Sequence, residues 1–280
     1  MILSRSILEL DWSDIKSKIA RFIKDYVEKS GLEGIVLGLS GGIDSSTTSA
    51  LCALAIGGDR VLGLLLPEQE TYSEEDVKHA RAVAQEFGFK TEMINVTPAL
   101  QKIYSSIPIF DEDERLCKGN VKARTRAIFW YYYANRLRRL VCGSSDKSEL
   151  MVGYFTKWGD AAADISPIMD LYKTQVRKLA QHIGVHEDIV AKPSSPGLWP
   201  GQVAERELKI DYETLDLVLY GLEHFMRVHE IARQLNIEEK AVQRIENRWC
   251  FMEHKRRMPI TTKIGYRTIG ADFRLPHTFY

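Results

Sequence analysis

The segment that most constrains the fold is residues 35–49, which read IVLGLSGGIDSSTTS. An apolar run typical of a buried strand (35–39) meets a turn of small and hydroxyl-bearing residues (40–46), and an apolar helical pattern opens at Thr47. Such a loop directs several backbone N–H groups at one point, and the following helix adds the positive end of its dipole. The segment therefore predicts a binding site for a polyanion, such as the phosphates of a nucleotide.

The residue types of this loop suit phosphate and a metal ion. Gly41 and Gly42 lack a Cβ, so phosphate oxygens can approach the backbone closely. Asp44 is an acid where anions are otherwise favoured, which makes sense if it holds a metal ion that bridges to the phosphates. The loop lacks the Gly-Lys-Ser/Thr of a Walker loop and the G-x-G-x-x-G of dinucleotide-binding folds. An ordinary glycine-rich turn is the alternative, and the strand–loop–helix context favours the functional interpretation.

The rest of the chain alternates strands and helices, as in a doubly wound α/β protein with a parallel sheet. Further strands are expected at 61–66, 91–96 and 140–143, with an acidic, mobile loop at 107–118. Helices are expected at 13–30, 47–56, 73–87, 98–105, 119–139, 173–183, 186–191, 212–225, 229–235 and 237–254. With 280 residues we expect one domain, with an α/β core (about 31–192), a lid loop (192–202) and a helical C-terminal part (203–280).

Composition excludes several classes of protein. The 38 basic and 38 acidic side chains balance, which argues against a broad nucleic-acid surface. The four cysteines form no C-x-x-C pair, so we expect mostly buried thiols in a reducing compartment. The N-terminus resembles no signal peptide, and no apolar window approaches the length of a membrane span. A cytoplasmic protein without nucleic-acid or membrane partners is expected.

Residues 129–133 are five consecutive aromatics within the helix expected at 119–139. Such a run covers every face of a helix, which is more than one core contact can use. Either the helix is sandwiched between the sheet and a neighbour, or it forms a subunit interface.

Two polar segments are expected at the carboxyl edge of the sheet, where ligands of open α/β sheets bind, and a third irregular segment follows them in the chain. Residues 144–146 follow the fourth strand, and residues 153–167 mix Lys157, Asp160 and Asp164 with glycines. Residues 192–202 hold three prolines and two glycines, so they cannot form a regular element. We interpret the last segment as a lid or a structured loop.

Six motifs in order along the chain resemble those of the ammonia-dependent NAD synthetases, which belong to the ATP pyrophosphatase superfamily. They are LSGGIDSS (39–46), KGNVKARTR (118–126), GSSDKSE (143–149), GYFTKWGDAAAD (153–164), KPSSPGLWPGQ (192–202) and HKRRMP (254–259). The resemblance implies an adenine nucleotide alpha hydrolase-like parallel sheet and a homodimer with deamido-NAD near its interface. That implication favours the interface interpretation of the aromatic helix.

The reaction that the resemblance implies is a two-step ligation with ATP as co-substrate and Mg2+ as cofactor. The nicotinate carboxylate of deamido-NAD attacks the α-phosphorus of ATP, giving an NAD-adenylate and pyrophosphate. Ammonia then displaces AMP to form the amide of NAD. Metal ions and Lys side chains offset the repulsion between the two anionic substrates.

The resemblance also implies roles for single residues. Those implied for ATP are Gly38, Leu39, Ser40, Gly41, Gly42, Ile43, Asp44, Ser45, Ser144, Lys173 and Ser195, with Asp44, Lys173 and Ser195 as catalytic residues. Those implied for deamido-NAD are Arg124, Lys157, Asp164, His254 and Lys255, and those for Mg2+ are Asp44 and Glu149. Taken singly, the five residues implied for deamido-NAD are ordinary surface charges, with His254 an ordinary helix-end histidine, so their assignment depends on the motifs around them.

The chain departs from the family pattern at a few positions. Ser144 stands where Thr is usual, and Pro196 where Ala is more frequent. After GLWPGQ the family commonly continues Thr-Asp-Glu, whereas this chain has Val203, Ala204 and Glu205. A contact made by that hydroxyl or acid beside the lid is thus in doubt, while the phosphate loop is intact.

Two other functions share the fold and the loop. A tRNA-modifying ATP pyrophosphatase would have a basic face and, usually, paired cysteines, which the neutral charge and cysteine spacing oppose. A nucleotide-binding module without catalysis would not require Asp44, Glu149, Lys157 and Lys173, which are all present. Free ammonia is the expected nitrogen donor, unless a separate glutaminase subunit supplies it, because no cysteine has the context of an amidase nucleophile.

Overall fold

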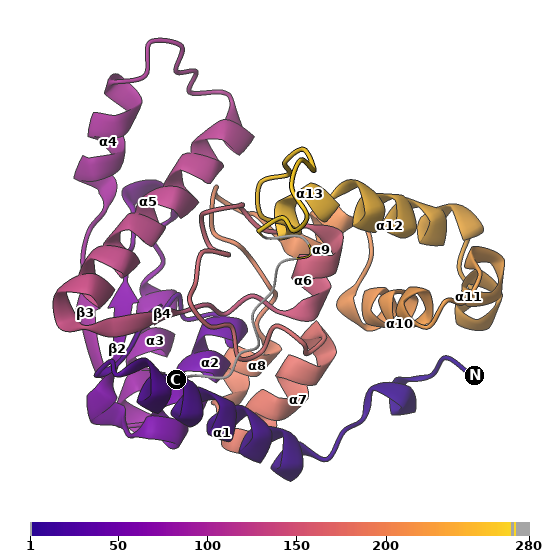
Figure 1. Ribbon diagram of the computed structural model, residues 1–280, viewed down its shortest axis with the longest axis horizontal. Helices are drawn as coiled ribbons and strands as arrows, with labels where there is room; N and C mark the ends of the chain where they lie inside the picture. Colours follow the sequence, from indigo (N-terminus) through magenta and orange to yellow (C-terminus); the bar gives the residue numbers. More distant parts are fainter. Residues whose placement is uncertain (1, 270–271, 273–280) are drawn as a thin grey trace.

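The computed structural model describes residues 2–269 and 272. Its sheet has four parallel strands in the order β3-β2-β1-β4, which confirms the predicted class of fold (Figure 1). Because β1 pairs with β2 on one side and β4 on the other, the strand order reverses next to β1, where such sheets bind ligands. The strands are β1 (Gly34–Gly38), β2 (Val61–Leu65), β3 (Lys90–Met93) and β4 (Arg139–Cys142).

Helices cover both faces of this sheet, and further helices form a separate group (Figure 1). Short 3-10 turns lie at Arg5–Leu8, Gly58–Arg60 and Gln69–Thr71. The helices are α1 (Trp12–Ser30), α2 (Ile43–Ile56), α3 (Glu74–Glu86), α4 (Thr97–Ser105), α5 (Arg115–Leu137), α6 (Lys147–Val152), α7 (Lys173–Ile183), α8 (Glu187–Ala191), α9 (Ala204–Leu208), α10 (Tyr212–Glu223), α11 (Val228–Leu235), α12 (Glu239–Phe251) and α13 (Glu253–Arg256).

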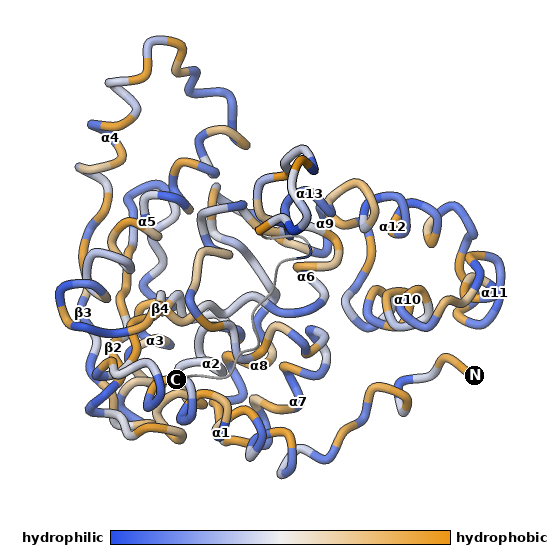
Figure 2. The backbone as a smooth tube through the Cα atoms, in the orientation of Figure 1, coloured by the Kyte–Doolittle hydropathy of each residue, from blue (hydrophilic) through white to orange (hydrophobic). Residues whose placement is uncertain are grey.

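Alternating side chains of β1 enter two different apolar clusters. Ile35 and Leu37 join the cluster beneath α1, α2 and α7, whereas Val36 joins the cluster beneath α4 and α5. Both sides of the strand are therefore buried, as expected for a parallel sheet covered on two faces. A third cluster joins α6, α9, α10, α11 and α12, and Figure 2 shows the apolar character of α10 within it.

The aromatic run on α5 is divided between the core and the surface. Four of its rings pack against the apolar cluster beneath α5, whereas Tyr132 is 68% exposed. Trp130 lies directly on the end of β1, because a Cβ at Gly38 would come within 2.5 Å of its ring. Glycine is therefore the residue that fits there. Contact with the sheet explains most of the run.

Several predicted boundaries were wrong. The second helix begins at Ile43 instead of residue 47, so Asp44 lies in its first turn. The third strand ends at Met93 instead of residue 96; beyond it Pro67 has no N–H to donate, and its carbonyl only accepts the N–H of Val96 at 3.0 Å. The long helix begins at Arg115, which shortens the acidic loop.

Other expectations failed near the C-terminus and for the thiols. The helix expected at 237–254 is two helices that meet at Met252, and α9 was not predicted. In the described part of the range 203–280 the helices end at Arg256, and residues 270–271 and 273–280 lie outside the described residues. Cys52 and Cys142 are buried, but Cys117 and Cys250 are exposed. Within the described residues, no helix is both long and apolar enough to span a bilayer.

Candidate active site

The loop between β1 and α2 is shaped by its own hydroxyls and glycines. The N–H of Ser40 donates to Ser45 Oγ at 3.2 Å, and the two side-chain oxygens lie 3.0 Å apart. Gly41 has a φ of +78°, and a Cβ there would lie 2.2 Å from the carbonyl oxygen of Asp76, so glycine is required. Gly42, which precedes α2, has no side chain to cap the helix. The N–H groups of the first turn thus face a potential anion without a competing cap.

A buried lysine and three carboxylates form the charged centre of the site. One carboxylate oxygen each from Asp44, Asp146 and Glu149 lie within 4.8 Å of one another. Lys173 Nζ lies 2.6 Å from Asp44 Oδ2, 2.6 Å from Asp146 Oδ2 and 2.9 Å from Glu149 Oε1. The side chains of Lys173 and Asp146 are fully buried. The cluster therefore joins α2, α6 and α7 at the carboxyl ends of β1 and β4.

Burial and mutual charge set the protonation of this cluster. Burial raises the pKa of Asp146, and it raises the pKa of Glu149 well above its usual range. Burial alone would lower the pKa of Lys173, but the carboxylates of Asp146, Asp44 and Glu149 raise it well above normal. Lys173 is therefore a cation at neutral pH.

The donor set of the cluster fits a divalent cation. When all groups are ionised, three negative charges stand against one positive charge, which leaves an excess of two. Asp44 Oδ1 is buried and has no hydrogen-bond partner among the described residues. Oxygen ligands of this kind suit Mg2+.

Asp146 is the member of this cluster to which sequence reasoning gave no role. It lay in the segment 144–146 that was expected at the ligand-binding edge, but its acid was not counted among the metal ligands. In the structure its Oδ1 also caps α6, accepting the N–H of Glu149 at 2.8 Å. An acid directly after a buried strand and before a helix was the signal available.

The other residues implied for ATP lie in two places. Ser144 follows β4, two residues before Asp146, on the same edge as the phosphate loop. Ser195 is exposed in the segment 192–202, where its Oγ accepts the N–H of Gly197 at 3.2 Å. The structure therefore places Ser144 beside the carboxylates but records the contact of Ser195 within its own loop.

Segment 192–202 lies against α3 and α5. Its Leu198 carbonyl accepts a hydrogen bond from the buried Lys122 at 2.9 Å, and Lys192 pairs with Asp76. Leu198 also sits over Gly119, where a Cβ would lie 3.1 Å from its own Cβ. The segment is thus irregular, as predicted, and is held by contacts at Lys192 and at Leu198.

Four residues implied for deamido-NAD come together beside α13. Arg124 Nε donates to the Lys157 carbonyl at 3.3 Å, and Lys157 Nζ donates to the His254 carbonyl at 2.7 Å. Lys255 Nζ donates to the carbonyl of Gly153 at 2.6 Å, and burial lowers its pKa to about 8. Segments that are about a hundred residues apart in sequence therefore form one basic group.

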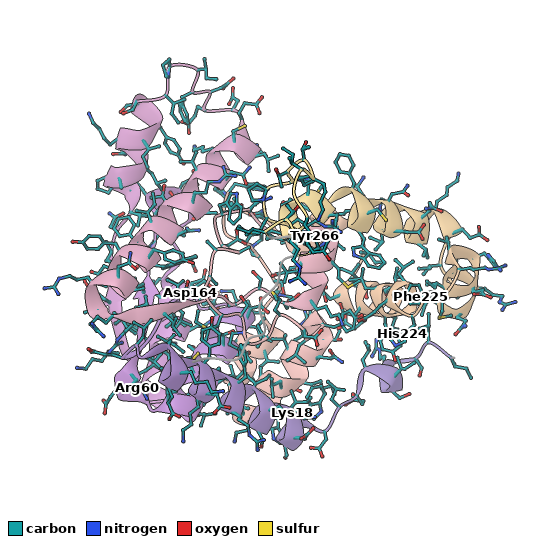
Figure 3. All side chains as sticks on the ribbon, in the orientation of Figure 1. Lys18, Arg60, Asp164, His224, Phe225 and Tyr266 are labelled. Atoms are coloured by element: carbon teal, nitrogen blue, oxygen red, sulfur yellow. The ribbon has the colours of Figure 1, made fainter. Side chains whose placement is uncertain are left out.

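Asp164, the fifth of these residues, lies apart from that group, beside α5 and β4 (Figure 3). Its Oδ2 accepts the N–H of Val141 at 2.8 Å, and its Oδ1 accepts the hydroxyl of Tyr131 at 3.4 Å. The contact with Tyr131 connects it to the aromatic helix.

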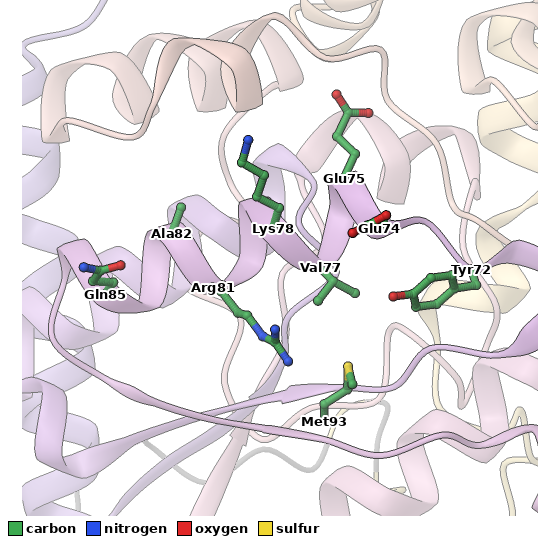
Figure 4. Close-up of a pocket in the computed structure, with 9 residues that line it drawn as sticks. All are labelled: Tyr72, Glu74, Glu75, Val77, Lys78, Arg81, Ala82, Gln85 and Met93. Carbon is green, nitrogen blue, oxygen red and sulfur yellow. The ribbon is translucent and has the colours of Figure 1, made fainter.

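A hollow on the outer side of α3 lies elsewhere (Figure 4). The hollow is lined by a mixture of acidic, basic and apolar side chains, and none of them belongs to the carboxylate cluster. The lining residues are Tyr72, Glu74, Glu75, Val77, Lys78, Arg81, Ala82, Gln85 and Met93.

A doubly wound parallel sheet, a glycine-rich phosphate loop at its switch point and a carboxylate–lysine cluster beside it define a nucleotide-binding α/β enzyme. The sequence profile of the NAD synthase family matches residues 15–259. The chain belongs to the NAD synthase family.

Known relatives agree with this assignment. An NH(3)-dependent NAD(+) synthetase from Aeropyrum pernix is 42% identical over 262 residues, which cover 92% of each chain. The structure resembles an NMN synthetase from Francisella tularensis (TM-score 0.81, 30% identity), covering 91% of this chain and 100% of that one. It also resembles an NH3-dependent NAD synthetase from Campylobacter jejuni (TM-score 0.76, 28% identity), with the same coverage.

Proposed function

We propose that this protein amidates deamido-NAD to NAD with ammonia, at the expense of ATP, which is cleaved to AMP and pyrophosphate. The overall reaction is that of the family to which the chain belongs. The observation that carries the proposal is the phosphate loop beside the cluster of Asp44, Asp146, Glu149 and Lys173. Because the reaction consumes ATP, we propose the cytoplasm as its compartment.

ATP is assigned to the switch point of the sheet. The loop Gly38 to Ser45 and the first turn of α2 bind its phosphates, and Ser144 contacts the ribose or adenine. Lys173 stays charged in its acidic surroundings, so it can offset negative charge that develops on the departing pyrophosphate. Ser195 contacts the phosphates from the lid.

Asp44 and Glu149 are the proposed ligands of Mg2+, with Asp146 within reach of the same point. The ion supplies positive charge that polarises the phosphoryl oxygens of ATP. The orphaned Asp44 Oδ1 supports this assignment.

The chemistry explains why ATP is needed. A carboxylate is a poor electrophile, so its oxygen must first become a leaving group, which we propose happens by bonding to the α-phosphorus. Pyrophosphate leaves in this step, giving an NAD-adenylate. Ammonia then attacks the acyl carbon, AMP leaves with the electrons of the C–O bond, and one proton is released from nitrogen.

Deamido-NAD is assigned to the basic group formed by Arg124, Lys157, His254 and Lys255, which suits its pyrophosphate. Asp164 contacts the same substrate from beside α5. We propose a homodimer whose interface includes α5, because Ile128 and Tyr132 are 63% and 68% exposed at positions i and i+4 of that helix. The substrate then lies near the interface.

A second acceptor is the mononucleotide that corresponds to NMN, nicotinate mononucleotide. It is favoured by the likeness to the structure named NMN synthetase, whose TM-score is 0.81. Both acceptors carry the same nicotinate carboxylate, so the charged cluster does not distinguish them. The adenylate half of the dinucleotide does.

The test is product formation by purified protein with ATP, Mg2+ and ammonium, given either deamido-NAD or nicotinate mononucleotide. We expect NAD, AMP and pyrophosphate in a 1:1:1 ratio, and a much higher kcat/KM for the dinucleotide. Glutamine in place of ammonium is expected to give little product. Formation of NMN at the higher kcat/KM would favour the second acceptor, and the absence of AMP with either acceptor would refute both.

Asp44→Asn tests the metal assignment in the same assay. Loss of a ligand charge next to the phosphates is expected to lower kcat by at least a hundredfold. Asp59→Asn, on the 3-10 turn after α2, changes the same residue type away from the cluster and is expected to retain activity. Equal activity of Asp44→Asn and the unaltered chain would contradict the assignment.

A further inference from the structure

One face of α10 supports the ATP-site lysine, although α10 belongs to the C-terminal helices. Tyr212 and Asp216 are residues i and i+4 of α10, so they lie on the same side of this helix, and both are fully buried. Lys173 Nζ lies 5.2 Å from the centre of the Tyr212 ring. The proposed reaction uses neither side chain directly.

Asp216 accepts hydrogen bonds from two elements of the site. Ser148 Oγ donates to its Oδ1 at 2.5 Å, and the N–H of Thr174 donates to its Oδ2 at 2.8 Å. Ser148 Oγ in turn accepts the N–H of Lys173 at 2.9 Å. The first two N–H groups of α7 therefore both end on the pair of Ser148 and Asp216.

Asp216 adds a long-range cap to the start of α7, where the local Gln175 side chain accepts the N–H of Tyr172 at 2.9 Å. The residue before α7 is Tyr172, whose phenol donates to Glu223 instead of closing the helix end. A carboxylate at a helix N-terminus is favoured by the dipole and by the free N–H groups. Here that carboxylate comes from α10, 42 residues along the chain from Thr174.

The first residue of α7 is Lys173, so the place where this helix begins determines where its ammonium lies. We propose that Asp216 is a positioning residue for the ATP-binding lysine and acts through the start of α7. This inference rests on the proposed function, in which Lys173 contacts the phosphates. It gives the C-terminal helices a part in the reaction, because α10 fixes a side chain that lies among three carboxylates.

The test is the affinity of the purified full chain for α,β-methylene ATP with Mg2+, measured by calorimetry together with the midpoint of thermal unfolding. We expect Asp216→Asn to weaken binding at least tenfold. Val218→Ala is the matched control, because Val218 is buried on α10 but faces another direction and joins only the apolar cluster. It is expected to lower the unfolding midpoint while binding within twofold of the unaltered chain.

A double-variant cycle separates positioning from general support. In a Lys173→Met background, Asp216→Asn is expected to change the affinity by less than twofold, since its effect passes through the lysine. Ser148→Ala, which removes only the bridging hydroxyl, is expected to weaken binding at least threefold, and it serves should Asp216→Asn fail to fold.

The outcomes distinguish this inference from the proposed function. Normal affinity in both Asp216→Asn and Ser148→Ala, or an undiminished effect of Asp216→Asn in the Lys173→Met background, would overturn the inference alone. Failure of the unaltered chain to bind the analogue would refute the proposed ATP site and the inference together.

Discussion

At the scale of residues, the site is built from acids whose burial is costly and whose partners are specific. Asp146 and Asp216 are fully buried, yet each accepts a backbone N–H at the start of a helix, α6 and α7 respectively. Hydrogen bonds to N–H groups compensate part of the loss of hydration. The same two acids thereby fix the elements that carry Glu149 and Lys173.

Asp216 also makes stability depend on pH. Burial raises its pKa from 3.8 to about 7, against the hydrogen bonds from Ser148 and Thr174. The folded protein therefore holds a proton that the unfolded chain has released, and the free energy of unfolding falls as pH rises toward 7. Between pH 5 and pH 8, the free energy of unfolding of the unaltered protein should fall by about 3 kcal/mol more than that of Asp216→Asn.

Urea denaturation of both proteins at pH 5, 6, 7 and 8 measures this difference. Ser17→Ala, on the exposed side of α1, is the control and should follow the unaltered protein at every pH. Parallel curves for Asp216→Asn and the unaltered chain would show that Asp216 does not titrate in this range.

The site residues that could be predicted from the sequence are those that neighbouring residues in the chain identify. The glycines and hydroxyls of the phosphate loop, and Asp44 within it, stand next to a strand and a helix, so their context is visible in fifteen residues. Asp216 gave no such signal, because its partner Ser148 is 68 residues away and one buried acid on an apolar helix resembles any other. Long-range contacts of this kind are decided by packing.

At the scale of elements, segment 192–202 is held by a buried lysine of α5 and the acids that surround it. Lys122 is 1% exposed and lies 2.7 Å from Glu68 and 2.6 Å from Glu70, while its third bond reaches the Leu198 carbonyl. Although burial raises the pKa of Glu68, the ammonium of Lys122 holds it below its usual value. One side chain of α5 thus connects the residues after β2 with segment 192–202.

Lys122→Met keeps the length of the side chain but removes the ammonium. The buried Glu68 then loses its cation, while Glu70 still pairs with Lys118 at 3.3 Å, so we expect about 3–5 kcal/mol of destabilisation at neutral pH. Segment 192–202 also loses the contact at Leu198, so proteolytic cleavage within it should become faster and KM for ATP should rise. Lys78→Met, on the exposed side of α3, is the control. An unchanged cleavage rate in Lys122→Met would show that Lys122 does not hold segment 192–202.

The order of strands and helices was predictable from apolar periodicity, and the parallel sheet followed from it. The residues at which helices begin were harder to predict. Residues 44–46 are small or polar and do not show an apolar helical pattern, yet α2 already begins at the buried Ile43, after the extended Gly42. The acid that sequence placed in a loop is therefore in the first turn of a helix.

At the scale of the whole molecule, α5 has one side that packs on the sheet and another that is exposed. One side of it packs on the sheet, and Ile128 and Tyr132 lie on the exposed side. We expect Tyr132→Glu to shift the protein from dimer to monomer in light scattering at micromolar concentration, because a charge in an apolar interface is costly. Ser17→Glu adds the same charge to α1, over the other face of the sheet, and should stay dimeric. A monomeric unaltered protein would contradict the proposed interface.

In the proposed reaction, the carboxylate of the acceptor is activated by transfer of the AMP group from ATP. The most direct test of this step uses deamido-NAD with both nicotinate carboxylate oxygens labelled with 18O, in a single incubation with ATP, Mg2+ and ammonium. If the carboxylate attacks the α-phosphorus, NAD keeps one labelled oxygen and the AMP phosphate gains the other, while pyrophosphate stays unlabelled. Label in pyrophosphate or inorganic phosphate, with AMP free of 18O, would show that the carboxylate attacks another phosphorus and would contradict the proposed adenylate.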